Sequence, residues 1–167
     1  GVYGQKVFIR GLIEVSSFCK NNCLYCGLRR GNKCAERYRL DEKEILECCR
    51  AGFDYGFRTF VLQSGEDRFW SVDKLCALVK KIKENFPECA VTLSVGELPL
   101  EAYRQLYAAG ADRYLLRHET ADAAHYAILH PACQTLENRL QCLRDLKEIG
   151  YQTGCGIMVG SPGQTAE

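Results

Sequence analysis

The chain has 167 residues, of which 47% are hydrophobic and 26% are charged, and its formal net charge is +1. This composition is ordinary for one soluble globular domain, and the near-neutral charge gives no support to binding of nucleic acids or membrane surfaces. No apolar run approaches the ~20 residues of a membrane-spanning helix, and residues 1–18 lack the pattern of a secretory signal, so we expect a cytoplasmic protein.

Short strand-like runs alternate with amphipathic helical segments along the chain. Asp41, followed three residues later by Glu44, is typical of a capped helix start, and Gly110 and Gly150 are typical of residues just after a helix. The expected strands are 11–17, 59–65, 90–96, 113–119 and 154–160, and the expected helices are 41–55, 71–85, 99–109, 122–129 and 136–149.

Strands that alternate with helices indicate βαβ units and a parallel sheet. We therefore expect an α/β fold, a partial TIM-type (β/α) barrel of about five βα units, because a full barrel needs roughly 250 residues. The chain lacks an initiator Met and stops in an apparent turn, so residues 1–167 are expected to be one core domain, the N-terminal part of a longer barrel. A doubly wound open sheet is the alternative fold, although no GxGxxG motif follows the first strand.

The cysteine content needs a chemical reason. The chain has 11 cysteines, an odd number in a chain longer than most disulfide-stapled scaffolds, which favours a reducing compartment. Cys19, Cys23 and Cys26 have CxxxCxxC spacing directly after the first expected strand. Three thiolates from one loop suit a [4Fe–4S] cluster whose fourth iron is open, whereas a structural zinc site needs a fourth ligand, which Cys34 could supply.

Polar residues at the ends of the expected strands suggest a site, because chemistry in such barrels takes place at the carboxyl ends of the strands. Strand residues alternate between faces, which directs Arg117 and Glu119 into the barrel mouth, either as a ligand-binding pair or as a salt bridge. The same alternation directs Gln63 and Thr92 inward and puts Cys155 on the opposite face from Met158. Three strands thus end in inward polar groups, which predicts a site.

The cysteine loop resembles the signature of the radical S-adenosylmethionine (SAM) superfamily, in which an aromatic residue, here Tyr25, precedes the third cysteine. The resemblance implies that the open iron binds the amino and carboxylate groups of S-adenosylmethionine. It also implies reductive cleavage of this cofactor to a 5′-deoxyadenosyl radical. The QSGED run at 63–67 is similar to the Gly-Gly-Glu segment that holds the methionine amino group, with Ser64 in the first glycine position. Glu66 and Asp67 could equally be solvated turn residues or a helix cap.

Longer segments, including RYLLRHET, VLQSGED and MVGSPGQT, resemble the [FeFe]-hydrogenase maturation enzymes of the HydE family. This resemblance implies that Thr92 and Arg117 line a deeper cavity for the substrate, as the candidate catalytic residues. Without the resemblance, Arg139 would as readily be an exposed partner of other helix charges, and Met158 plain core filling. The residues that would surround S-adenosylmethionine are Tyr25, Gln63, Ser64, Glu119, Arg139 and Met158.

The resemblance also implies partners: a small-molecule or organometallic iron substrate, other hydrogenase maturases, and an electron donor such as ferredoxin or flavodoxin. Two sibling enzymes remain alternatives, methylornithine synthase and a biotin synthase-like protein, and the outward position expected for Cys155 counts against sulfur insertion. A non-catalytic zinc-binding fragment is the alternative from another functional class.

Overall fold

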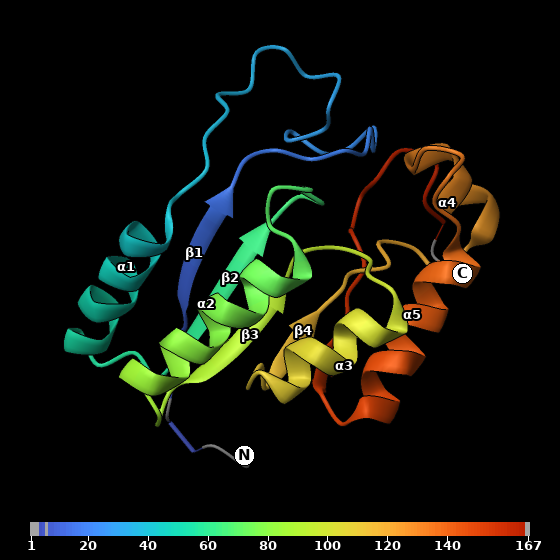
Figure 1. Cartoon of the computed structure of the whole chain (residues 1–167). Coiled ribbons are helices and arrows are strands. Elements are labelled where there is room, and N and C mark those ends of the chain that lie inside the picture. The colour runs from blue at the N-terminus through green and yellow to red at the C-terminus, as the bar shows by residue number, and fades with distance from the viewer. Residues whose placement is uncertain (1–3, 6, 166–167) are drawn as a thin grey trace.

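The structure is a computed structural model that describes residues 4–5 and 7–165 of the chain. It contains a five-stranded parallel sheet whose strands alternate with helices along the chain (Figure 1). All five helices begin and end within one residue of their expected bounds. The elements are β1 (Gly11–Ser16), α1 (Glu42–Asp54), β2 (Thr59–Ser64), α2 (Val72–Asn85), β3 (Ala90–Ser94), α3 (Leu100–Ala108), β4 (Arg113–Leu115), α4 (Ala123–Leu129), α5 (Leu136–Ile149) and β5 (Gln152–Gly154).

The strands lie in the order β1-β2-β3-β4-β5, so each strand pairs with its neighbour in sequence. A doubly wound sheet would reverse its order at a switch point, which makes that alternative wrong. The successive parallel pairing is the winding of a (β/α) barrel, and the described strands form an arc of such a barrel. This confirms the expected fold class.

The two faces of the sheet differ in burial. Ile13, Val15 and Leu62 on the helix side are 6%, 0% and 0% exposed. On the opposite face, which would be the barrel interior, Leu12 is 57% exposed and Glu14 is also exposed. The core therefore lies between the sheet and its outer layer of helices, while polar side chains occupy the inner face.

The sequence explains the helix starts and stops directly. The Asp41 side chain accepts a hydrogen bond from Glu44 N, and the Glu44 side chain accepts one from Asp41 N, which is a complete capping box. Helix α5 ends at Gly150, whose left-handed φ of 111° suits glycine. These local signals fix helices that pack one face against the sheet.

The last two strands are shorter than expected, and the predicted position of the fifth strand is wrong. Strand β4 ends at Leu115 because the segment after it bends away, with Glu119 in the left-handed region at φ 65°. The ladder with β4 pairs Gln152–Gly154 and leaves residues 155–160 outside the strand, apart from one bridge between Glu119 and Ile157. The backbone there still pairs irregularly, since Met158 N donates to Glu119 O at 2.9 Å.

Residues 17–40, which carry the three cysteines, run over the carboxyl ends of the strands before α1 begins (Figure 1). Helix α4 lies beside this segment, and Leu24 N donates to Leu129 O at 2.9 Å. Within the described residues, no helix combines the length and apolar character required to cross a membrane.

Candidate functional site

The cysteine loop, residues 19–26, follows β1 and carries three free thiols. Cys23 is buried, and its Sγ donates a hydrogen bond to Oε1 of Gln134 at 3.3 Å. Cys19 Sγ accepts one from Asn21 N at 3.4 Å. Two of the three sulfurs thus hydrogen-bond to other protein groups, and among residues 4–5 and 7–165 no three Cys, His, Asp or Glu side chains converge on an ion-sized point.

The three cysteine sulfurs are nevertheless suitable ligands for iron, and they lie close to one another. Burial, followed by the neighbouring Cys19 and Cys26, raises the pKa of the Cys23 thiol to about 11, so the three sulfurs lie near enough to affect one another. A metal ligates the thiolate form, so metal binding has to displace this proton. The loop therefore offers three soft sulfur ligands, and these residues fit a cluster with three cysteine ligands.

Arg37 ties together the segments on either side of the cysteine loop. Its Nη1 donates to the carbonyls of Ser17 and Leu28, the latter at 3.0 Å, and its Nη2 donates to the carbonyls of Arg29 and Asn32 at 2.9 and 3.1 Å. A guanidinium in a fixed fork suits this cluster of carbonyls, because it carries five donors. The sequence alone did not identify Arg37, because a single arginine after the cysteine motif gives no indication of where its side chain points.

Gly65, which follows β2, allows the close approach between the cysteine loop and the sheet. A Cβ at this position would lie 2.6 Å from the carbonyl oxygen of Phe18 and closer still to Cβ of Cys19. Any side chain there would push the loop off the strand end. Gly65 of the QSGED run therefore determines how closely Cys19 approaches the end of β2.

An inner cavity of about 320 Å³ opens beneath the cysteine loop, at the carboxyl ends of β1 to β4. It brings together one of the three cysteines and six of the other eight candidate residues. The end of β1 also contributes Glu14 and Ser16, and the end of β3 contributes Ser94. Gln63 Nε2 donates to Glu14 Oε1 at 3.3 Å across the mouth. The candidate residues that line the inner cavity are Tyr25, Cys26, Gln63, Ser64, Arg117, Glu119 and Arg139.

Arg139 is not the exposed helix residue that the alternative predicted; that alternative is wrong. Its side chain is 9% exposed, and its Nε donates to Glu97 Oε1 at 2.6 Å. Its Nη1 donates to the carbonyl oxygen of Arg117 at 2.9 Å. Arg139 thus brings a buried positive charge from α5 to the inner cavity and holds the segment after β4 in place.

Thr92 and Met158 lie apart from the other candidates. Thr92 is 4% exposed, faces the barrel interior between Val61 and Arg113, and does not line the inner cavity. Its Oγ1 has no hydrogen-bond partner within the described part of the chain. Met158 is half-buried near Glu119 but likewise does not line the inner cavity. The strand alternation thus predicted the inward face of Thr92 but not its depth, and Met158 lies beyond the end of β5.

Tyr25 joins the cysteine loop to the end of α4. Its hydroxyl lies 3.1 Å from Nε2 of His130, and the His130 ring stacks on Tyr126 with centroids 3.7 Å apart. Burial lowers the pKa of His130, which favours the neutral ring at this contact. Burial, then Cys23, raises the pKa of the Tyr25 hydroxyl, so Tyr25 stays a neutral phenol. Tyr25 therefore has a structural partner in addition to its place at the cavity.

Glu66 is neither a solvated turn residue nor a helix cap, the two roles that its sequence position allowed. Its side chain is 10% exposed and pairs with Lys20 Nζ at 2.9 Å. Glu66 Oε1 accepts from Glu97 N at 3.1 Å and from Gln134 Nε2 at 3.3 Å. Gly96, at φ 89°, leaves room for this carboxylate, since a Cβ there would lie 2.7 Å from Oε1. Glu66 thus links the loops that follow β2 and β3 to the turn before α5.

Asp67 ties the same loop to β1. It accepts hydrogen bonds from Ser16 Oγ at 2.6 Å and from Arg39 at 2.7 and 3.0 Å. Burial by itself would raise the pKa of this carboxyl, but the hydrogen bonds from Arg39 and Ser16 outweigh it, and the pKa is lowered. Helix α2 is capped by Ser71 instead, so Asp67 is not a cap either.

The other cysteines do not gather around the loop. Cys34 is exposed, and nothing in the described residues arranges it with the three loop cysteines as a fourth ligand. Cys49, Cys89 and Cys142 are buried in or beside helices and the sheet, where packing is their ordinary role. Cys155 is exposed.

Comparison with known protein families gives one match over most of the chain. The model of the radical SAM superfamily matches residues 13–167. Over 98% of its length the chain is 52% identical to the [FeFe] hydrogenase maturase subunit HydE of Thermotoga maritima. It is 31% identical over 95% of its length to the 3-methylornithine synthase of Methanosarcina acetivorans. The chain spans 46% and 45% of these two relatives, about half of each.

Solved structures give the same picture of the fold. The crystal structure of methylornithine synthase (PylB) superposes with a TM-score of 0.89 at 30% identity, over 95% of this chain and 47% of the other. The crystal structure of HydG, a maturase of the [FeFe]-hydrogenase, superposes with a TM-score of 0.84 at 26% identity, over 95% of this chain and 36% of that one.

Proposed function

The chain belongs to the radical SAM superfamily, and from this premise we propose that it is the cluster-binding part of a [FeFe]-hydrogenase maturation enzyme. The enzyme cleaves S-adenosylmethionine reductively and acts in the maturation of the diiron subcluster. The observation that carries the proposal is the convergence of Cys26 and six further polar or aromatic residues on one inner cavity. The 52% identity to HydE, against 31% to 3-methylornithine synthase, favours maturation over the sibling chemistry.

Cys19, Cys23 and Cys26 hold the [4Fe–4S] cluster in this proposal. When bound, the cluster and S-adenosylmethionine supply a 5′-deoxyadenosyl radical at the strand ends. The protein's part is to fix the geometry and to keep water and competing reactions away. Gly65 lets the loop lie directly on the end of β2, and Arg37 ties together the carbonyls on either side of the loop; both support the precise placement that this requires.

The inner cavity supplies complementary groups for the zwitterionic end of S-adenosylmethionine. Glu119 is a carboxylate partner for an ammonium group, and Arg139 is a guanidinium partner for a carboxylate. Gln63 and Ser64 add neutral donors and acceptors at the end of β2, and Tyr25 offers an aromatic edge to the adenine. Met158 completes the proposed set of cofactor-binding residues, although it lies outside the lining.

Arg117 and Thr92 are the proposed substrate-side residues. Arg117 lines the inner cavity beyond Glu119, where its guanidinium suits an anionic group of a small or organometallic iron substrate. Thr92 lies deeper on the same face, and its buried, unpartnered hydroxyl is available to a ligand that reaches that depth. Other hydrogenase maturases would hand on such a substrate, and ferredoxin or flavodoxin would supply the electron.

Anaerobic reconstitution with iron and sulfide tests the proposal. We expect close to four irons per chain and reductive cleavage of S-adenosylmethionine to 5′-deoxyadenosine. Cys23→Ser should abolish both the cluster signal and cleavage, whereas the matched variant Cys76→Ser, on α2, should retain them. Equal loss in both variants would show that the assignment of three cluster cysteines is wrong.

Two further outcomes separate the alternatives. Zinc retention without a brown iron chromophore would support the zinc-binding fragment and overturn the enzyme proposal. Formation of 3-methylornithine from lysine by the loaded protein would instead identify the sibling synthase.

A further inference from the structure

A second hollow lies outside the sheet, on the far side of the cysteine loop from the inner cavity. This outer groove has a volume of about 670 Å³ and runs between the cysteine loop, the loops after β2 and β3, and the first half of α5. It shares no lining residue with the inner cavity. A partner in the outer groove would therefore leave the inner cavity free. The residues that matter below are Lys20, Arg30, Arg68, Gln134 and Asp145.

The segment that includes most of the cysteine loop, residues 20–33, is rich in positive charge, and its Lys20 and Arg30 line the outer groove. Residues 20–33 contain four cationic side chains, Lys20, Arg29, Arg30 and Lys33, and no Asp or Glu. This is a local concentration, since the whole chain has a net charge of only +1. Arg30 and Arg68, one on each side of the groove, make no ion pair with any described residue. These two charges are available to a partner.

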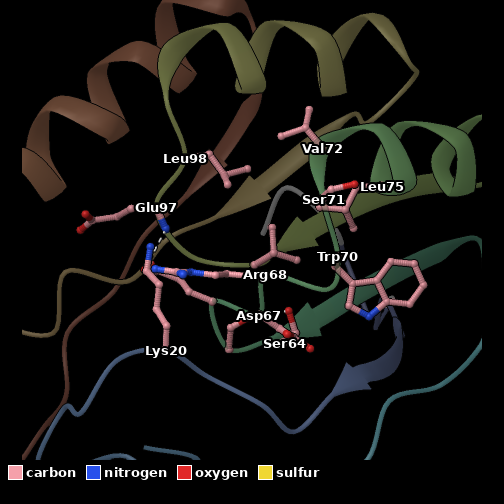
Figure 2. Close-up of a pocket in the computed structure, with 13 residues that line it drawn as sticks. Lys20, Ser64, Asp67, Arg68, Trp70, Ser71, Val72, Leu75, Glu97 and Leu98 are labelled. Atoms are coloured by element: carbon pink, nitrogen blue, oxygen red, sulfur yellow. Dashed lines mark hydrogen bonds and ion pairs between the residues drawn. The ribbon is translucent and has the colours of Figure 1, made fainter. Parts of the chain in front are cut away.

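The acidic residues of the outer groove are mostly neutralised within the protein. Glu66 pairs with Lys20 at 2.9 Å, and Glu97 pairs with Arg139 at 2.6 Å. A third pocket, lined by residues that include Ser64, Trp70 and Val72, shares Lys20, Arg68 and Glu97 with the outer groove. Figure 2 shows the Lys20 and Arg68 side chains at the Glu97 end of this pocket, while the Glu97 carboxylate points away from it. Only Asp145, at the far end on α5, lacks a cationic partner in the part of the chain that the structure describes. The side nearest the cysteine loop is therefore positive.

One residue that lines the groove is hydrogen-bonded to a proposed cluster ligand. Gln134 lines the groove, and its Oε1 is 3.3 Å from Cys23 Sγ. Its Nε2 is held by Glu66 at 3.3 Å, so the side chain spans the wall between the surface and the sulfur. Cys26, by contrast, lies on the inner side. Cys26 thus lines the inner cavity, whereas Cys23 is separated from the outer groove by the Gln134 side chain.

We propose that the outer groove is the docking surface for a small acidic electron-carrier protein of the ferredoxin kind. The inference rests on the proposed function. The reduced carrier loses one electron, the cluster gains it on the Cys23 side, and no bond forms or breaks in this step. Transient electron-transfer complexes use small, charge-steered interfaces, which suits a groove with two unpaired arginines. Electrons enter from outside while cofactor and substrate occupy the inner cavity.

The test measures how fast the cluster-loaded protein is reduced by a reduced acidic ferredoxin, followed by the loss of visible absorbance in stopped flow. The double variant Arg30→Glu, Arg68→Glu should lower the second-order rate constant about tenfold or more at low salt. Its ferredoxin affinity, measured by calorimetry, should fall in parallel. The wild-type rate should decrease as salt is added, while the variant rate should depend on salt weakly or in the opposite sense.

A control variant separates docking from net charge. Lys80→Glu, Lys147→Glu makes the same change in charge on exposed positions of α2 and α5 that do not line the groove. It should stay within about twofold of wild type. Dithionite, which needs no docking surface, should reduce all three proteins at the same rate. Equal rates with ferredoxin in the groove and control variants, with dithionite reduction intact, would overturn the docking proposal alone. A wild-type protein that assembles no reducible cluster would overturn the proposed function and this inference together.

Discussion

The segment that carries the three cysteines, residues 17–40, is held to the barrel by several contacts, and two groups of them, called anchors here, differ in charge. The first anchor consists of Ser16, Arg39 and Asp67, and it is ionic: Asp67 accepts from both partners at 2.6 to 3.0 Å. It joins the ends of β1 and β2, which are neighbours in the sheet.

The second anchor consists of Leu129, His130 and Gln134, and it is neutral. These residues contact Leu24, Tyr25 and Cys23 through three hydrogen bonds of 2.9 to 3.3 Å. Its partners are separated by as many as 111 residues in sequence. The ionic anchor forms between adjacent strand ends, whereas the neutral anchor forms only once α4 has folded back over the loop. A neutral anchor close to the sulfurs also avoids adding charge beside a metal site.

Removal of the ionic anchor should have the largest effect. Asp67→Ala removes the acceptor of the Ser16 hydroxyl proton and of the Arg39 guanidinium, at a site where the Asp67 side chain is only 3% exposed. The unfolding free energy of the metal-free protein, from urea titration, should fall by about 3 kcal/mol. Asp73→Ala on the exposed first turn of α2 is the control and should cost less than about 1 kcal/mol. A loss for Asp67→Ala no larger than that of the control would show that the first anchor is dispensable.

Acid should weaken the ionic anchor selectively. The folded-state pKa of Asp67 is lowered, so its stabilisation is complete above the unfolded pKa of about 3.9 and is lost as pH falls through the folded value. The difference in unfolding free energy between wild type and Asp67→Asn should therefore be constant near neutral pH and shrink below about pH 4. A difference that stays constant down to the lowest accessible pH would mean that the charge of Asp67 is not what stabilises the anchor.

Loss of the neutral anchor should lower the unfolding free energy by less than loss of the ionic anchor. The size of this loss should not shrink below about pH 4. Gln134→Leu removes the partner of Cys23 and one partner of Glu66, and we expect about 1 to 2 kcal/mol of lost stability in the metal-free protein. Gln141→Leu on the exposed face of α5 provides the matched control. If the penalty for Gln134→Leu disappears below pH 4 as that of Asp67→Asn does, the proposed contrast between the anchors is wrong.

Tyr25→Phe tests the weakest contact of the second anchor. It removes only the hydroxyl that lies 3.1 Å from His130 and keeps the aromatic ring. Because Tyr25 is 38% exposed, water can replace part of this hydrogen bond, and we expect about 0.5 to 1 kcal/mol. Thermal unfolding of Tyr25→Phe alongside Tyr55→Phe, an exposed tyrosine after α1, measures the difference. No difference between the two would remove Tyr25 from the anchor.

Much of the fold could be predicted from local patterns. The capping box at Asp41 and Glu44 and the glycine after α5 are signals within a few residues, and the helices that they delimit were predicted within one residue. The strand alternation correctly predicted the inner face that carries Gln63 and Thr92. It failed after β4, because Glu119 adopts a left-handed backbone that no strand pattern predicts. The fifth strand pairs with β4 over residues 152–154 instead of the expected 154–160.

The candidate site was only partly predictable. The cysteine spacing is a local signal, and the resemblance to a known family pointed to Arg139. The roles of Glu66, Glu97 and Gln134 had no sequence signal, since each depends on a partner from another loop. Without that resemblance Arg139 would be taken for a surface residue, because the spacing of residues along a helix does not reveal that Glu97, from another loop, forms an ion pair with it.

By itself, the sequence determined the element order, the parallel barrel winding and the three thiols on one loop, because capping, periodicity and cysteine spacing act within a few residues. Only the tertiary structure decided that Cys26 lines the inner cavity and that the Gln134 side chain separates Cys23 from the outer groove. It also decided which carboxylates are neutralised, so that unpaired arginines remain beside the loop. Those features depend on contacts between segments that are far apart in sequence, such as Cys23 and Gln134. Local sequence patterns do not encode such contacts, because the folding of the whole chain brings the two segments together.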